Sequence, residues 1–183
     1  MELDKTIKER KSVRDYTSKT PDWRKIIECI DSMRLAPMAG NIFSLKFILV
    51  SDSQKIQKLA EASQQDFVAQ SQYVVVVCTD KKMILNEYEK RGEIYCKQQA
   101  GAAIQNFLLK ITEARLSTCW VGHFVENEIK RELKIPPEID VEAIFPIGYE
   151  KGISHRKRKP NLDNLLYFNT YKNKKMWKPK RVD

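Results

Sequence analysis

The chain has 183 residues, 42% of them hydrophobic and 31% charged, a balance that fits one globular domain and excludes a disordered chain. No apolar run approaches the roughly 20 residues of a membrane-spanning helix, no apolar core of a signal peptide follows Met1, and the four scattered cysteines and two histidines offer no closely spaced zinc ligands. The net charge of +9 comes entirely from residues 151–183, which carry 11 basic and 2 acidic residues against 22 of each in residues 1–150. We therefore expect one cytoplasmic domain over residues 1–183, without a metal site, with buried reduced cysteines and with residues 151–183 as a basic C-terminal arm.

Hydrophobic spacing in the first third of the chain predicts three helices and a strand. The first helix covers residues 3–11, and Asp22 caps the second. The second helix must end before Pro37, because the residue ahead of a proline avoids helical angles. Residues 45–50 are predicted to form a strand, and Ser53 opens a short third helix.

The middle of the chain combines a buried strand with a long helix. Residues 73–78 are apolar at every position and β-branched at four, which predicts a strand covered on both faces in the middle of a sheet. A helix is predicted for residues 94–115, with Gly101 inside it. Glycine in a helix interior costs about 1 kcal/mol relative to alanine. We therefore expect another backbone to approach Gly101 closely, in the core or across a dimer axis.

Three shorter elements complete the chain before its basic arm. A strand over residues 117–121 ends at Gly122, and Asn127 opens a helix that Pro136 stops. Residues 141–147 alternate in polarity as a strand does. Because the strands are separated by helices without a simple βαβ rhythm, the pattern predicts an α+β fold.

The segment Arg10-Lys11-Ser12-Val13-Arg14 follows the first helix. Three cations and a hydroxyl within five residues can donate several hydrogen bonds to a phosphate. In an extended segment Arg10, Ser12 and Arg14 share one side. The simpler alternative is an exposed cluster of charges.

Two further segments have the composition of ligand-binding loops. Ala36-Pro37-Met38-Ala39-Gly40-Asn41 predicts a tight loop that presents amides to a planar ligand, or that only turns the chain from helix to strand. Cys119-Trp120-Val121-Gly122-His123 runs from a strand into a glycine, where a ligand ring can approach the main chain. His123 has no identified partner, which makes it weak evidence for acid–base catalysis.

His155-Arg156-Lys157-Arg158-Lys159-Pro160 heads the basic arm and adds anion-binding groups. A dinucleotide fingerprint, a P-loop and a G-x-S-x-G elbow are all absent from the sequence. The chain therefore offers anion-binding parts without catalytic side chains, and we expect a bound cofactor to supply any chemistry.

Taken in order, these segments resemble the nitroreductase family of FMN-dependent oxidoreductases, and the resemblance covers residues 4–170. It implies a layered α/β/α fold, with a central and mostly antiparallel sheet flanked by helices, in a homodimer that exchanges C-terminal arms. It implies FMN as cofactor and NADH or NADPH as electron donor. Hydride would pass through flavin N5 to a small electron acceptor such as a nitroaromatic or a quinone.

The resemblance also implies an FMN site at the dimer interface, without a catalytic side chain. The phosphate would be held from the N-terminal segment and the basic arm, the partner would contribute the loop, and a main-chain amide would lie near N5. Gln64, or its neighbour Gln65, would make a polar contact. The implied cofactor-binding residues are Arg10, Ser12, Arg14, Pro37, Met38, Ala39, Asn41, Gln64, Val121, Gly122, Arg156 and Arg158.

Residues 42–45 depart from the family pattern, since they read Ile-Phe-Ser-Leu where Q-P-W commonly follows the loop asparagine. The pocket for the electron acceptor is therefore expected to differ. Three alternatives stay open: a specialised flavin enzyme, such as a dehalogenase or heterocycle oxidase, a flavin-storage module, and a basic nucleic-acid-binding protein that uses the arm. A membrane partner is not expected, and nucleic acid is the less favoured partner.

Overall fold

The computed structural model describes residues 2–152 and 158–177. Its helices are α1 (Leu3–Glu9), α2 (Trp23–Asp31), α3 (Ser53–Ser63), α4 (Lys82–Glu113), α5 (Glu126–Leu133) and α6 (Leu162–Leu165), with short 3-10 helices η1 (Ser32–Leu35), η2 (Ala39–Asn41) and η3 (Asp66–Gln70). Its strands are β1 (Leu45–Val50), β2 (Tyr73–Asp80), β3 (Ser117–Thr118) and β4 (Ile139–Gly148).

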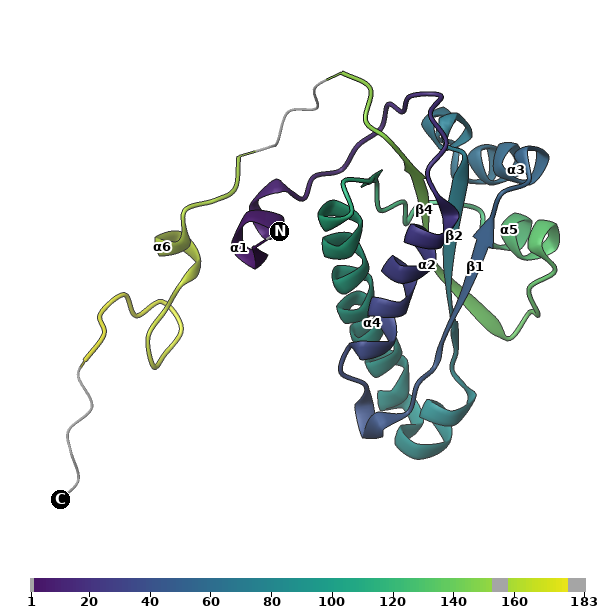
Figure 1. Ribbon diagram of the computed structural model, residues 1–183. Coiled ribbons are helices and arrows are strands. Elements are labelled where there is room, and N and C mark those ends of the chain that lie inside the picture. The colour runs from purple at the N-terminus through teal and green to yellow at the C-terminus, as the bar shows by residue number, and fades with distance from the viewer. Residues whose placement is uncertain (1, 153–157, 178–183) are drawn as a thin grey trace.

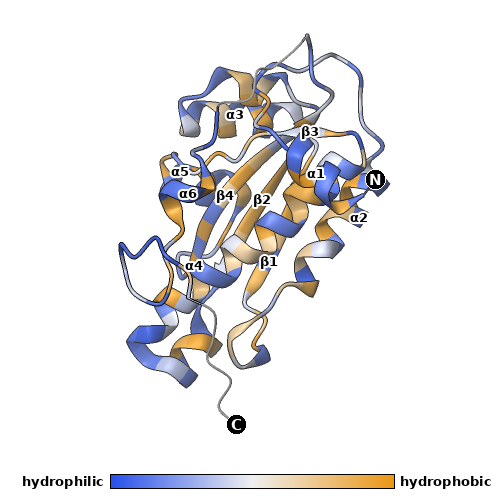
Figure 2. Ribbon diagram, turned by 90° about the vertical axis from the view of Figure 1, so that its left-hand side faces the viewer, coloured by the Kyte–Doolittle hydropathy of each residue, from blue (hydrophilic) through white to orange (hydrophobic). Residues whose placement is uncertain are grey.

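The strands form one antiparallel sheet in the order β1-β2-β4-β3. Helices α2 and α4 cover one face of this sheet, and α3 and α5 cover the other (Figure 1). Strand β2 is hydrophobic along most of its length (Figure 2). Val75 and Val77 pack toward α2 and α4, whereas Val74 and Val76 pack toward α3 and α5. The predicted two-sided burial of this strand and the layered α+β fold are confirmed.

Two predicted elements differ from the structure. Helix α4 starts at Lys82, not at residue 94, and non-helical backbone at Glu89 separates its first turns from the rest. The polar residues around this break leave no apolar period that could have predicted those turns. The strand predicted over residues 117–121 forms ladder pairs only at Ser117 and Thr118, and Val121 rejoins the sheet in an isolated bridge to Ile144.

The remaining predictions hold to within a few residues. Asp22 caps α2 by accepting a hydrogen bond from the Arg24 backbone N–H at 3.0 Å. The helix ends before Pro37, as expected, and all four cysteines are buried and unpaired. The expected close approach of another backbone to Gly101 within the core is not observed, because apart from its own helix backbone no described atom lies within 4 Å of the position that a Cβ would take there. None of the helices in the described ranges is long and apolar enough to cross a membrane.

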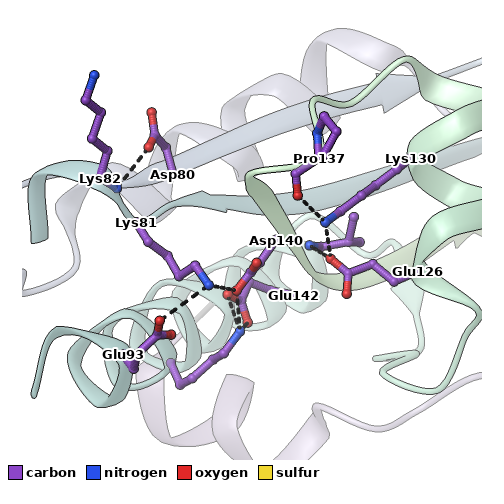
Figure 3. A network of polar contacts seen from close by, with 11 residues as sticks. Asp80, Lys81, Lys82, Glu93, Glu126, Lys130, Pro137, Asp140 and Glu142 are labelled. Carbon is purple, nitrogen blue, oxygen red and sulfur yellow. Dashed lines mark hydrogen bonds and ion pairs between the residues drawn. The ribbon is translucent and has the colours of Figure 1, made fainter. Parts of the chain in front are cut away.

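A network of ion pairs ties the first half of α4 to the start of β4 (Figure 3). The Asp140 carboxylate lies 3.1 Å from Lys81 Nζ and 3.3 Å from Lys97 Nζ. Lys97 also contacts Glu142 at 2.9 Å, and Lys81 contacts Glu93 at 3.5 Å. Burial raises the pKa of Asp140, but the hydrogen bonds and charges of Lys81 and Lys97 outweigh it, so this pKa lies below its usual value.

Asp140→Asn is expected to lower the free energy of unfolding by about 1 kcal/mol at pH 7, because it removes two ion pairs from a network. Since the pKa of Asp140 is depressed in the folded state, its contribution is present above the unfolded pKa of about 4 and is lost as the pH falls through the folded pKa. Urea unfolding at pH 7 and pH 3 measures this difference. Asp66→Asn, an exposed carboxylate outside the network, is the control. An equal loss at both pH values would contradict the ionic origin.

Candidate functional site

The segment after α1 is extended and held against the sheet. The Val13 N–H donates to the Thr118 carbonyl at 3.0 Å, and the Lys151 N–H donates to the Asp15 carbonyl at 3.0 Å. Val13 is buried, whereas Ser12 and Arg14 are exposed. The expected alternation is therefore observed for Ser12, Val13 and Arg14, and the main chain at the start of the basic arm lies beside this segment.

Tyr16 anchors this segment, a role that the sequence did not indicate. Its hydroxyl donates to the Val13 carbonyl at 2.8 Å and lies 3.3 Å from the Pro146 carbonyl. Its backbone N–H donates to Gln70 Oε1 at 3.1 Å. The ring lies so close to Gly148 that a Cβ there would come within 2.8 Å of it. Because Gln70, Pro146 and Gly148 are distant from Tyr16 in sequence, no local pattern could have predicted these contacts.

The N-terminal segment meets the Cys-Trp-x-Gly segment at Cys119. Burial raises the pKa of the Cys119 thiol, and the charge of Arg14, a hydrogen bond from Ser12 and the charge of Arg10 act in the opposite direction. Together with the hydrogen bond from Val13 to Thr118, these influences show that the N-terminal segment lies next to the second segment. Two motifs more than 100 residues apart in sequence share one place in the fold.

Gly122 carries the amide that is available beside these residues. The Val121 N–H donates to the Ile144 carbonyl at 3.1 Å, and the Val121 carbonyl accepts from the Ile144 N–H at 3.0 Å. The main chain of Val121 is thus committed to the sheet. Among the described residues, no group accepts a hydrogen bond from the Gly122 N–H. This amide is therefore free to donate to a ligand.

Further cations line a pocket of about 640 Å³ next to the N-terminal segment. Lys11 Nζ lies 2.7 Å from the Glu150 carboxylate at its rim. Arg158 is exposed, and Arg156 lies outside the described residues. The basic side chains that line the pocket are Lys5, Lys8, Arg10, Lys11 and Arg115.

The predicted tight loop is shaped by two left-handed residues and one buried glutamine. Gly40 and Asn41 have φ angles of 57° and 56°. Gln99 on α4 is 4% exposed, and its Oε1 accepts from the Ala39 N–H at 3.2 Å while its Nε2 donates to Ser44 Oγ at 2.5 Å. Gln99, which the sequence did not single out, therefore ties the loop at Ala39 to Ser44, the residue before β1. A pocket of about 360 Å³ beside it is lined by Pro37, Met38, Ala39, Tyr95, Gln98, Gln99 and Ala102.

The loop and the N-terminal segment lie at different places along α4. The loop packs at Gln99, and the pocket next to the N-terminal segment is lined by Ile111. At 1.5 Å per residue, these helix positions are about 18 Å apart. A single chain therefore does not bring the two predicted halves of the site together.

Gln64 and His123 both lie on the surface. Gln64 ends α3 in the left-handed conformation, with φ of 54°, and its side chain is exposed. The Val125 N–H donates to the Ala62 carbonyl at 2.8 Å, which places this end of α3 beside the segment after Gly122. His123 is exposed in the same segment.

Comparison with known proteins gives one consistent result. The family model described as "Nitroreductase family" matches residues 7–66 and 61–149. A curated protein of Archaeoglobus fulgidus named "Putative NADH dehydrogenase/NAD(P)H nitroreductase" is 28% identical over 152 residues, which cover 80% of this chain and 84% of that protein.

Solved structures share the fold. A nitroreductase family protein of Clostridium novyi NT has a TM-score of 0.76 at 27% identity and covers 94% of this chain and 96% of its own. A Clostridium difficile R20291 protein titled "FMN-dependent Nitroreductase" has a TM-score of 0.76 at 23% identity and covers 91% and 98%. Since the family model spans most of the described body, the chain belongs to the nitroreductase family.

Proposed function

We propose that this protein is a cytoplasmic FMN-dependent oxidoreductase that passes electrons from NADH or NADPH to a small acceptor such as a nitroaromatic or a quinone. The observation that carries the proposal is the hydrogen bond from the Val13 N–H to the Thr118 carbonyl, which holds the segment of Arg10, Ser12 and Arg14 against the strand that leads to Gly122. When bound, FMN supplies hydride acceptance and donation at N5. With a nitroaromatic, NAD(P)H and one proton are consumed, and the nitroso compound, NAD(P)⁺ and water are produced.

The donors present fit a flavin mononucleotide. Arg10 and Ser12 would bind the phosphate, because a dianion needs several charged donors around it. Arg156 and Arg158 would add to these from the basic arm. Arg14 would lie at the pyrimidine edge of the ring, where a cation favours added negative charge.

The main chain and one further side chain would complete the contacts made by this subunit. The Gly122 N–H would donate toward the reactive edge of the ring, and Val121 would support that amide through its bridge to Ile144. Gln64 would add a polar contact, since the end of α3 lies beside this segment. The protein's role would be to bind, orient and exclude water, and no side chain is assigned as a catalytic acid or base.

The site would be completed by a second copy of the chain. Its own loop lies about 18 Å away along α4, so Pro37, Met38, Ala39 and Asn41 would serve the site of the partner. Gly101 is open, which leaves room for a partner helix to pack closely there. Residues 158–177 extend from the body (Figure 1) and expose Leu162, Leu165, Tyr171, Met176 and Trp177. These side chains would dock the arm on the partner, which makes residues 1–183 one domain with an exchanged arm.

A visible absorption spectrum of the purified protein, followed by heat release of the chromophore, tests this proposal. Released FMN, bleached by NADH or NADPH and restored by a quinone or nitroaromatic, is the expected result. Comparing the two nucleotides at equal concentration identifies the preferred donor. A colourless protein that also fails to bind added FMN would refute the proposal.

A further inference from the structure

The backbone next to the tight loop is strained at one residue. Glu89 has φ of 46° and ψ of −134°, a combination that side chains other than glycine rarely adopt. Beyond it, Gly92 packs so closely on Ile84 that a Cβ would lie 2.9 Å from both the side chain and the carbonyl oxygen of Ile84. The first turns of α4 are thus folded back onto the rest of the helix. Strained backbone costs free energy and persists only where the surrounding structure holds it in place. Residues of this kind cluster at active sites and ligand-binding sites.

The fold-back brings Tyr88 to the loop, next to Tyr95 and Arg91 on the main part of α4. The Tyr88 hydroxyl lies against Gly40, 2.5 Å from the position of a Cβ there. The Tyr88 and Tyr95 rings meet edge to face, with centroids 5.1 Å apart. The Arg91 guanidinium carbon lies 5.5 Å from the centroid of the Tyr95 ring. Tyr95 also lines the 360 Å³ pocket beside the loop.

This cluster has the chemistry of a site for a planar anion. Aromatic faces and edges bind planar rings, and a guanidinium that rests on an aromatic ring keeps N–H donors at its rim for a carboxylate. Among the described residues, no carboxylate lies within ion-pair distance of Arg91. Glu93 is already engaged by Lys81.

We propose that Tyr88, Arg91 and Tyr95 form the wall that selects the electron acceptor, and that the class selected is a planar aromatic compound with a carboxylate substituent. This inference rests on the proposed function, in which the loop beside the wall faces the flavin of the partner. The strained turn at Glu89 is what places Tyr88 between Tyr95 and the loop.

Calorimetric titration of the purified holoprotein with benzoate and with neutral benzamide tests whether the wall prefers a carboxylate, independently of catalytic turnover. The wild type is expected to bind benzoate about tenfold more tightly than benzamide, which corresponds to one charge-assisted contact. Arg91→Gln is expected to remove this preference. Lys90→Gln removes a charge of the same sign at the neighbouring position and is expected to keep it. Tyr95→Leu is expected to weaken both ligands, whereas Tyr95→Phe retains the stacking surface and is expected to weaken neither.

Steady-state reduction of 4-nitrobenzoate and 4-nitrobenzamide separates this inference from the proposed function. In Arg91→Gln, KM for 4-nitrobenzoate is expected to rise about tenfold, while kcat and KM for the amide stay within about twofold. If the wild type reduces 4-nitrobenzoate and 4-nitrobenzamide with equal kcat/KM, the proposed selection of a carboxylate is wrong, while the proposed oxidoreductase function is still supported. Benzoate binding that depends on Arg91, in a protein that oxidises neither nucleotide, would support a binding site for an aromatic carboxylate at these residues, but it would refute the proposed function and with it the selection of an electron acceptor. Identical binding in Arg91→Gln and Lys90→Gln would overturn the inference.

Discussion

Arg10→Ala is expected to weaken FMN binding about 10- to 100-fold, because one charge-assisted hydrogen bond to a phosphate contributes about 1.5–3 kcal/mol. Arg10 follows the last turn of α1 and is half-buried next to the exposed Ser12. The fold is expected to persist without this side chain, since the adjacent segment is held by Val13 and Tyr16. Quenching of flavin fluorescence on titration of the apoprotein measures the dissociation constant, and thermal unfolding of the apoprotein checks the fold.

Lys8→Ala is the matched control for this variant. Lys8 lines the same 640 Å³ pocket, but it lies on α1 and outside the Arg-x-Ser-x-Arg segment. Its substitution is expected to change the dissociation constant less than about threefold, as a general loss of one surface charge does. Equal weakening in both variants would mean that only the overall charge matters. An unchanged dissociation constant in Arg10→Ala would remove this residue from the phosphate site.

Mixed dimers of two defective chains are expected to regain about half of the FMN content of the wild type. One chain carries Arg10→Ala, and the other carries Gly40→Val. The valine would be strained, because Gly40 has φ of 57° and its Cβ would lie 2.5 Å from the Tyr88 hydroxyl. If each site combines Arg10 of one subunit with the loop of the other, the mixed dimer contains one intact site and one doubly damaged site.

Refolding the two variants together, with a different affinity tag on each chain, isolates the mixed dimer for FMN quantification. Each homodimer of a single variant is the control and is expected to retain little FMN. A mixed dimer as empty as both controls would contradict the shared site, because a site within one chain would be damaged in every subunit. Recovery of about half of the content would support the assignment of the loop to the partner.

The strand at residues 73–80 illustrates what a local pattern can predict. A run of β-branched residues without a polar face can be satisfied only between two covering layers, so its position in the centre of the sheet followed from composition. The cap of α2 at Asp22 could likewise be predicted from the sequence, since the capping hydrogen bond joins residues two positions apart. The turns of α4 before Glu89 could not be predicted from the sequence, because their position depends on the packing of Ile84 against Gly92.

The candidate site was predictable in its parts but not in its assembly. The segments around Ser12, Ala39 and Gly122 each carry a local composition suited to ligand contact. The residues that position them, Tyr16 and Gln99, carry no such signal, because each acts through hydrogen bonds to residues far away in sequence.

By itself the sequence determined the strand and helix types, the two-sided burial of β2 and the residue types available for an anion and a planar ring, since all of these depend on neighbours within a few positions. Only the tertiary structure decided that the N-terminal segment pairs with Thr118 next to Cys119, while the tight loop packs about 18 Å away along α4. Antiparallel pairing and helix packing join residues more than 100 positions apart, and the hydrogen bonds that do so are made by backbone groups that every residue carries. For that reason no local sequence pattern predicts these contacts, and the geometry of the site could be determined only from the tertiary structure.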